Sequence, residues 1–172
     1  DGQIPPLIFV VGLILIGEDV DNQKSTSGYV YTLVGGAIAW RSKKQTTVAL
    51  SSTEAEYVAA ALAAKEGIWI KAILEELNLF KVPTLELNCD NQSCINLARN
   101  PKMSNNISHV SFKHHFLRDL IEDKKIELKF TPSTSMWADF LTKPVSSQKH
   151  ILCCKKIGLL NFSKVEEKNM MF

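Results

Sequence analysis

The sequence lacks several patterns that would assign it quickly to a class of protein. Its 172 residues include only 4 cysteines, and none of them falls in paired CxxC or CxxC…HxxxH spacings. This scarcity argues against a zinc finger and against the disulfide framework of a small secreted domain. We therefore expect a protein of a reduced, intracellular compartment.

Long apolar runs and an excess of one charge are also missing. The apolar run Leu7–Gly17 is shorter than the roughly 18 residues that a membrane span needs, and no basic segment precedes it. We interpret this run as a buried strand and expect neither a targeting segment nor a membrane partner. Lysine and arginine number 20 against 18 aspartates and glutamates. The net charge of +2 implies no strongly basic face, so nucleic-acid binding must be argued from a site.

What is present reads as alternating strands and helices. Tyr29–Val34 and Ala37–Arg41 are rich in β-branched and apolar residues, and Gly35–Gly36 between them predicts a hairpin turn. Ser51 opens a capping box, and strong helix formers predict a long helix from about Thr53 to Leu77.

The rest of the chain continues this alternation. The further predicted elements are a strand at Leu85–Cys89, helices at Gln92–Arg99 and His109–Asp123, a strand at Ile126–Phe130, a helical turn at Met136–Leu141 and a helix at Ser147–Ile157. A chain of this length fits one domain, and the element order predicts an α/β fold with a mixed sheet flanked by helices. Spaced apolar neighbours place Trp40 and Trp69 in the expected core.

Three acidic residues stand where this arrangement would gather them at one edge of the sheet. Glu56 lies in the first turns of the long helix, Asp90 follows the strand Leu85–Cys89, and Asp139 begins a helical turn. Residues at the carboxyl ends of strands face the ligand crevice of open α/β sheets. Convergent carboxylates repel one another unless a cation lies between them, which favours magnesium or manganese. Taken singly, each acid has an ordinary interpretation as an exposed helix residue, a turn former or a helix cap.

Longer motifs carry a resemblance to a known family. They are KSTSGYVYTLVGGAIAWRSKKQ (Lys24–Gln45), TVALSSTEAEYVAA (Thr47–Ala60), CDNQSCINLARNP (Cys89–Pro101) and WADFLTKP (Trp137–Pro144), and His109–Phe116 adds a weaker match. In this order and spacing they closely resemble the ribonuclease H domain of copia-type LTR retrotransposon Pol polyproteins. The resemblance covers about Asp19 to Leu160.

The resemblance implies a ribonuclease H-like fold with a five-stranded mixed β-sheet flanked by α-helices. It also implies two-metal hydrolysis of the RNA strand of RNA·DNA hybrids. Glu56, Asp90 and Asp139 match the catalytic, metal-binding carboxylates, with Glu54 as an alternative to Glu56 in the same motif. The implied cofactor is Mg2+ or Mn2+. The implied partners are the hybrid and the upstream reverse transcriptase portion of the polyprotein, in a cytoplasmic particle or the nucleus.

One departure from the family pattern changes the expected activity. The family carries a segment like YSDADWAGD on its first strand, whereas Leu13 and Leu15 stand at the positions of its two acids. We therefore divide the chain into a degenerate first-strand region (1–18), a ribonuclease H-like domain (19–160) and a C-terminal tail (161–172).

Loss of a carboxylate that bridges both metals predicts weak metal binding and little turnover, unless Glu18 or Asp19 replaces it. The alternative is a catalytically dead nucleic-acid-binding or structural remnant of the same domain.

Overall fold

The structure is a computed structural model that describes residues 9–10, 24–46, 48–78, 84–100 and 111–159. Leu13, Leu15, Glu18 and Asp19 lie outside these residues, as does the tail 161–172. Among the described residues, no helix is both long enough and apolar enough to cross a membrane.

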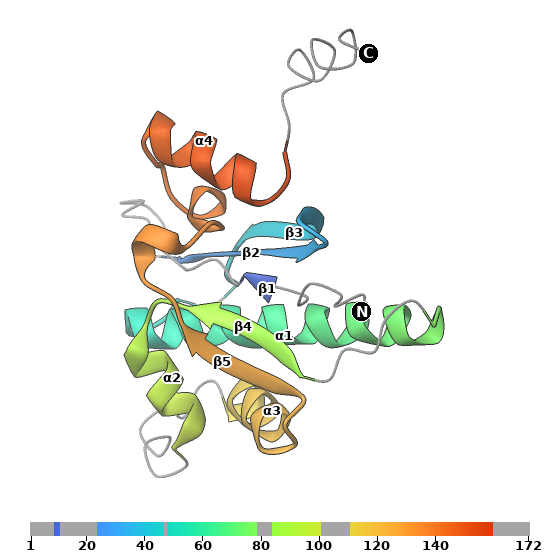
Figure 1. Cartoon of the computed structure of the whole chain (residues 1–172). Helices are drawn as coiled ribbons and strands as arrows, with labels where there is room; N and C mark the ends of the chain where they lie inside the picture. The colour runs from blue at the N-terminus through green and yellow to red at the C-terminus, as the bar shows by residue number, and fades with distance from the viewer. Residues whose placement is uncertain (1–8, 11–23, 47, 79–83, 101–110, 160–172) are drawn as a thin grey trace, which may run out of the picture.

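The strands of the described residues form a five-stranded mixed sheet at the centre of the domain, in the order β3-β2-β1-β4-β5 (Figure 1). The strands are β1 (Phe9–Val10), β2 (Thr26–Leu33), β3 (Gly36–Lys44), β4 (Leu85–Cys89) and β5 (Ile126–Phe130). β1 pairs antiparallel with β2 and parallel with β4, and β4 pairs parallel with β5. The predicted fold class is thus confirmed, and the hairpin strands share one sheet with Leu85–Cys89 as expected.

The hairpin between β2 and β3 turns one residue earlier than the sequence predicted. Leu33 pairs with Gly36, so the turn residues are Val34 and Gly35 rather than the glycine pair. Both have positive φ, 52° and 82°, as a two-residue type I′ turn requires. This register places Val34, a β-branched residue, in a backbone region that such residues rarely adopt.

Three helices cover one face of the sheet and build the main core (Figure 1). They are α1 (Ser52–Glu76), α2 (Gln92–Arg99) and α3 (Ser111–Glu122), close to the predicted bounds. Ser51 caps α1 by accepting a hydrogen bond from the Glu54 amide, as the capping box predicted. Small residues let α1 approach the strands closely, and a Cβ on Gly67 would meet Leu85 Cδ2 at 2.3 Å.

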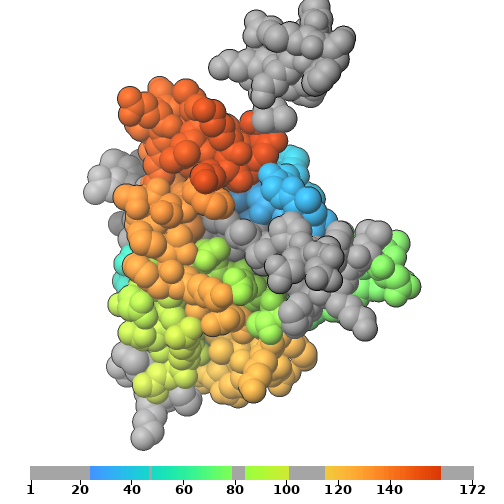
Figure 2. All heavy atoms as spheres, viewed as in Figure 1, coloured from blue at the N-terminus to red at the C-terminus, as the bar shows by residue number. Residues whose placement is uncertain are grey.

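The opposite face carries the C-terminal segment, which Figure 2 shows in orange and red beside the blue hairpin. This segment contains η2 (Ser133–Ser135), η3 (Asp139–Leu141) and α4 (Ser147–Lys156). Its apolar contact with the sheet is a second, smaller cluster: Val30, Met136, Ala138 and Ile157 are all buried there. Side chains along a strand point alternately to the two faces of the sheet. On β2, Tyr29 and Tyr31 therefore face the helical core, and Val30 faces the smaller cluster.

Two tryptophans depart from the sequence-based expectation. Trp40 on β3 and Trp69 on α1 are 66% and 60% exposed, so neither belongs to the core. β3 is an edge strand with most of its residues exposed, and Trp69 lies on a mostly buried helix at a position that faces outward. Apolar neighbours in the sequence therefore did not indicate whether Trp40 and Trp69 lie on the buried or on the exposed face of their strand and helix.

Candidate active site

The candidate site lies where β4 ends and three segments meet. Glu56 comes from the first turns of α1, Asp90 follows β4 directly, and Asp139 begins η3. Ala55 and Tyr57 on either side of Glu56 are fully buried, which fixes this part of α1 against its neighbours. Likewise, burial of Ala138 in the smaller cluster holds the turn that presents Asp139.

Glu56 is a buried carboxylate with mainly weak partners. Only 6% of its surface is exposed. Cys89 Sγ lies 3.9 Å from Glu56 Oε2, a thiol contact at the end of β4. Burial and, to a lesser degree, the negative charge of Asp90 raise the pKa of Glu56 to about 7, although a hydrogen bond with the Asn91 side chain acts in the opposite direction. The charge of Asp90 therefore acts on Glu56.

Glu54, the alternative acid in the same motif, is used locally. Its Oε2 accepts a hydrogen bond of 2.8 Å from the Leu50 amide, and its own amide donates to Ser51 Oγ. These contacts hold the entry of α1. Glu56 rather than Glu54 is therefore the acid that contacts the end of β4.

Asp90 is tied to the segment after β5. Ser133 Oγ donates a hydrogen bond of 2.6 Å to Asp90 Oδ2. The other oxygen, Oδ1, is buried and has no hydrogen-bond partner among the described residues. One oxygen of Asp90 is thus satisfied within the chain, and the other remains available to a ligand.

Asp139 is fully buried and paired with two lysines. Lys143 Nζ lies 3.1 Å from Asp139 Oδ2, and Lys149 Nζ donates to the same oxygen. Lys149 also donates to the Ser133 carbonyl at 2.8 Å. Within the described part of the chain, Oδ1 of Asp139 has no hydrogen-bond partner. The charge of this acid is therefore compensated internally, through one of its two oxygens.

Other residues link the three acids indirectly. Ser133 contacts Asp90 through its hydroxyl and Lys149 through its carbonyl, and Lys149 reaches Asp139. Lys143 pairs with Asp139, and its positive charge also acts on Glu56.

The three acids do not form a direct cluster in this structure. Among the described residues, the group of possible ligand atoms lying within 4.8 Å of one another consists of Glu56, Cys89 and Cys94. Convergence of Glu56, Asp90 and Asp139 on one cation stays a prediction for the metal-bound protein.

The carboxylate oxygens at this site suit a divalent cation, but the lysines beside them oppose its binding. Asp90 and Asp139 each keep a buried oxygen without a partner, which is the kind of ligand that magnesium and manganese take. Lys143 and Lys149 already supply positive charge to Asp139. A cation at Asp139 would therefore compete with two ammonium groups.

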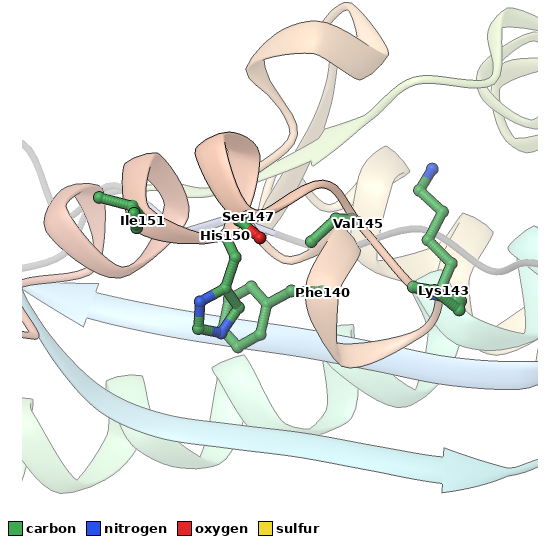
Figure 3. A pocket seen from close by; sticks show the side chains of 7 residues that line it. Phe140, Lys143, Val145, Ser147, His150 and Ile151 are labelled. Atoms are coloured by element: carbon green, nitrogen blue, oxygen red, sulfur yellow. The ribbon is translucent and has the colours of Figure 1, made fainter.

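A neighbouring hollow between η3 and α4 is lined by Phe140, Lys143 and His150 among others. Figure 3 shows Phe140 and His150 side by side in it, with Lys143 directed away. The two rings meet edge to face, with centroids 5.6 Å apart. A second hollow is lined by Ser133, Asp139, Lys143 and Lys149 among others.

Comparison with known proteins supplies the relatives of this chain. No family model matches it. It is 40% identical over 82% of its length to a retrovirus-related Pol polyprotein from transposon TNT 1-94 of Nicotiana tabacum. It is 34% identical over 83% of its length to the corresponding polyprotein from transposon RE2 of Arabidopsis thaliana. The chain spans about 10% of each of these relatives.

A solved structure, the RNase H1 from the halophilic archaeon Halobacterium salinarum NRC-1, is 16% identical to the chain with a TM-score of 0.47. The match covers 69% of this chain and 82% of that one.

The mixed sheet and its helices agree with the ribonuclease H-like fold that the motifs predicted. The chain belongs to the retrovirus-related Pol polyproteins of plant transposons, as the motifs also predicted.

The sequence analysis did not predict that Lys143 and Lys149 pair with Asp139. The pair with Lys143 could have been predicted, because Lys143 lies four residues after Asp139, a spacing that favours an ion pair. Lys149 lies on a separate helix, and its position in the sequence gives no such indication.

Proposed function

We propose that this domain is a ribonuclease H-type nuclease of the copia-type Pol polyprotein class, and that its turnover is impaired. Its substrate in this proposal is the RNA strand of an RNA·DNA hybrid, and its site residues are Glu56, Asp90 and Asp139. The observation that supports the proposal is that Ser133, Lys143 and Lys149 link these acids near the end of β4. Among the described residues, one buried oxygen of Asp90 and one of Asp139 have no hydrogen-bond partner.

Mg2+ or Mn2+ is the cofactor that this site would take. Asp90 and Asp139 would hold it through their free oxygens, with Glu56 as the third ligand. When bound, such a cation supplies a Lewis acid for phosphodiester hydrolysis. The residues themselves position the acids: Ser133 orients Asp90, and the buried turn around Ala138 orients Asp139.

Impairment follows from the first-strand region. Leu13 stands at the position of the family's first-strand acid and cannot bind a cation. The lysines on Asp139 act in the same direction, because they compete with a metal for that acid. We therefore expect weak metal binding and slow cleavage.

The proposal extends to partners and place of action. The hybrid and an upstream reverse transcriptase portion are the expected partners, because the relatives are Pol polyproteins many times longer than this chain. The corresponding compartment is intracellular, in a cytoplasmic particle or the nucleus. Contacts with hybrid phosphates should weaken as salt rises.

Cleavage of a labelled RNA·DNA hybrid tests the proposal directly. With magnesium, Leu13→Asp should cleave at least about a hundredfold faster than the natural chain, since each 1.4 kcal/mol of transition-state stabilisation is about tenfold in rate. Leu15→Asp is the matched control and should rescue less. Adding Asp90→Asn to Leu13→Asp should abolish the gain.

Robust cleavage by the natural chain that disappears with Asp19→Asn would show that a loop acid had replaced the missing ligand. Absence of rescue by Leu13→Asp would contradict the assignment of that position.

The second candidate is a domain that binds hybrid without cleaving it. The internal pairing of Asp139 with two lysines favours it, because this pairing stabilises the acid without any metal. Salt-sensitive hybrid binding by both the natural chain and Leu13→Asp, with no cleavage by either, would select this candidate.

A further inference from the structure

Two cysteines that are separated in sequence meet beside Glu56. Cys89 ends β4, and Cys94 lies in the first turn of α2. One ligand atom from each of Cys89, Cys94 and Glu56 lies within 4.8 Å of the other two. All three residues are buried, with exposures of 4%, 0% and 6%.

The spacing of these atoms suits a small tetrahedral metal. With zinc bonds of about 2.3 Å to sulfur and about 2.0 Å to oxygen, the edges of the tetrahedron are about 3.8 Å between sulfurs and about 3.5 Å from sulfur to oxygen. Cys89 Sγ and Glu56 Oε2 are already 3.9 Å apart. Closing the ligands onto a metal therefore needs shifts of a few tenths of an ångström along that edge.

The local backbone holds the cysteines in place. Asn91 caps α2, and its Oδ1 accepts from the Cys94 amide at 3.0 Å. Its carbonyl oxygen lies 3.7 Å from Cys89 Sγ. Asn91, in the turn between β4 and α2, thus contacts both the Cys89 thiol and the Cys94 backbone amide, and the two cysteines lie together beside Glu56.

We propose that Glu56, Cys89 and Cys94 form a binding site for a thiophilic divalent cation such as Zn2+. Thiolate ligands select zinc and related metals, whereas magnesium and calcium take oxygen ligands. Binding releases the two thiol protons to solvent, and the three protein ligands leave the fourth position to a water molecule. No oxidant or reductant takes part.

The site has a consequence for the proposed nuclease. Glu56 is shared, so a thiophilic cation that binds Glu56 withdraws it from Asp90 and Asp139. Zinc is then an inhibitor that acts at a different set of ligands from the magnesium site. The binding itself rests on Cys89 and Cys94 and holds whether or not the domain cleaves hybrid.

Cobalt is the probe for this site, because thiolate-bound Co2+ absorbs in the near ultraviolet and carboxylate-bound Co2+ does not. The reduced whole chain is stripped with chelator and titrated with Co2+ without oxygen. We expect a charge-transfer band that saturates at one equivalent, is lost on adding Zn2+, and persists in excess Mg2+. A natural chain that shows no such band would overturn the proposal.

Matched variants assign the band to its ligands. Cys94→Ala should lower the affinity for Co2+ at least about a hundredfold, because changes outside the ligand shell alone lower it about 10- to 100-fold. Cys153→Ala is the control, since Cys153 is an equally buried helical cysteine outside the cluster. An unchanged band in Cys94→Ala, or its loss in Cys153→Ala alone, would contradict the assignment.

A measurement on the natural chain covers the case in which a variant does not fold. Alkylation in mild denaturant, followed by peptide mass spectrometry, should label Cys89 and Cys94 more slowly with Zn2+ than with Mg2+. Labelling of Cys153 should be the same in both. Equal labelling of Cys89 and Cys94 in the two metals would overturn the proposal. This result would not bear on whether the domain cleaves the hybrid, so the two proposals can fail separately.

Discussion

Glu56 and Asp139 lie at the same edge of the sheet and are both hidden from water, with 6% and 0% of their surfaces exposed. Their surroundings differ. Asp139 has two lysine ammonium groups on one oxygen, whereas Glu56 has a thiol, the Asn91 amide and the nearby charge of Asp90. Burial of a carboxylate without a cation favours its neutral form, and a direct ion pair favours the charged one.

This comparison separates two ways of keeping an acid inside a protein. The chain stabilises Asp139 by itself, so that acid needs no external cation. Glu56 lacks a direct ion pair in the described structure, and its pKa of about 7 leaves it partly protonated near neutral pH. Glu56 is therefore the acid whose state is more open to change by a bound metal.

The largest expected effect comes from removing the cations around Asp139. Lys143→Met combined with Lys149→Met should lower the free energy of unfolding by about 3–5 kcal/mol, because it leaves a buried charge unpaired. Urea denaturation in chelator measures the loss. Adding Asp139→Asn should recover most of it. A loss below about 1 kcal/mol would mean that these pairs behave like exposed surface pairs.

The contribution of Glu56 to the free energy of unfolding should depend on pH. Its folded pKa of about 7 lies above the ordinary value of 4.5, so its contribution to stability is fully present below pH 4.5 and is lost as pH rises through 7. Glu56→Gln should therefore become more stable than the natural chain with rising pH. The full difference between 4.5 and 7 corresponds to about 3.4 kcal/mol, and screening by solvent reduces it to on the order of 2 kcal/mol above pH 7.

Denaturation midpoints across this pH range, without metal, test the trend. Glu76→Gln, an exposed change on the same helix, is the control for loss of a carboxylate outside the site. A stability gap between Glu56→Gln and the natural chain that narrows as pH rises would contradict a raised pKa at Glu56.

Removing one of the two ammonium groups beside Asp139 should make this acid a better metal ligand. Lys149→Met should raise the affinity for Mn2+ by about tenfold, which corresponds to about 1.4 kcal/mol. Electron paramagnetic resonance of free Mn2+ measures it. Lys155→Met, on the exposed side of the same helix, is the control and should leave the affinity unchanged. Equal affinities in all three proteins would show that Lys149 does not compete with the metal.

The smallest expected effect comes from a change in the hairpin turn, which serves as a control for effects of global stability. Val34→Asn in the hairpin turn should stabilise the domain by about 1 kcal/mol, because asparagine tolerates the left-handed backbone better than valine. Thermal unfolding measures it. The pH dependence and the Mn2+ affinity should match those of the natural chain. A change in either would mean that the comparison between Glu56 and Asp139 reports on global stability.

Much of the fold could be predicted because its signals are local. Leu85–Cys89, Gln92–Arg99 and Ile126–Phe130 have the predicted bounds, since periodicity and capping residues act within a few positions. The hairpin turn was misplaced by one residue and Trp40 was wrongly assigned to the core. Both depend on strand pairing and on which sheet face is covered, which are not local properties.

The sequence by itself determined the class of domain, the order of its elements and the identity of its candidate acids. It did so through motifs whose residues are close together in the chain. Only the tertiary structure decided what surrounds each acid. Lys149 reaches Asp139 from another helix, and Cys94 reaches Glu56 across the end of β4. Charge and burial act over a few ångströms in space regardless of separation along the chain, so the state of a buried acid follows from the packing of distant segments.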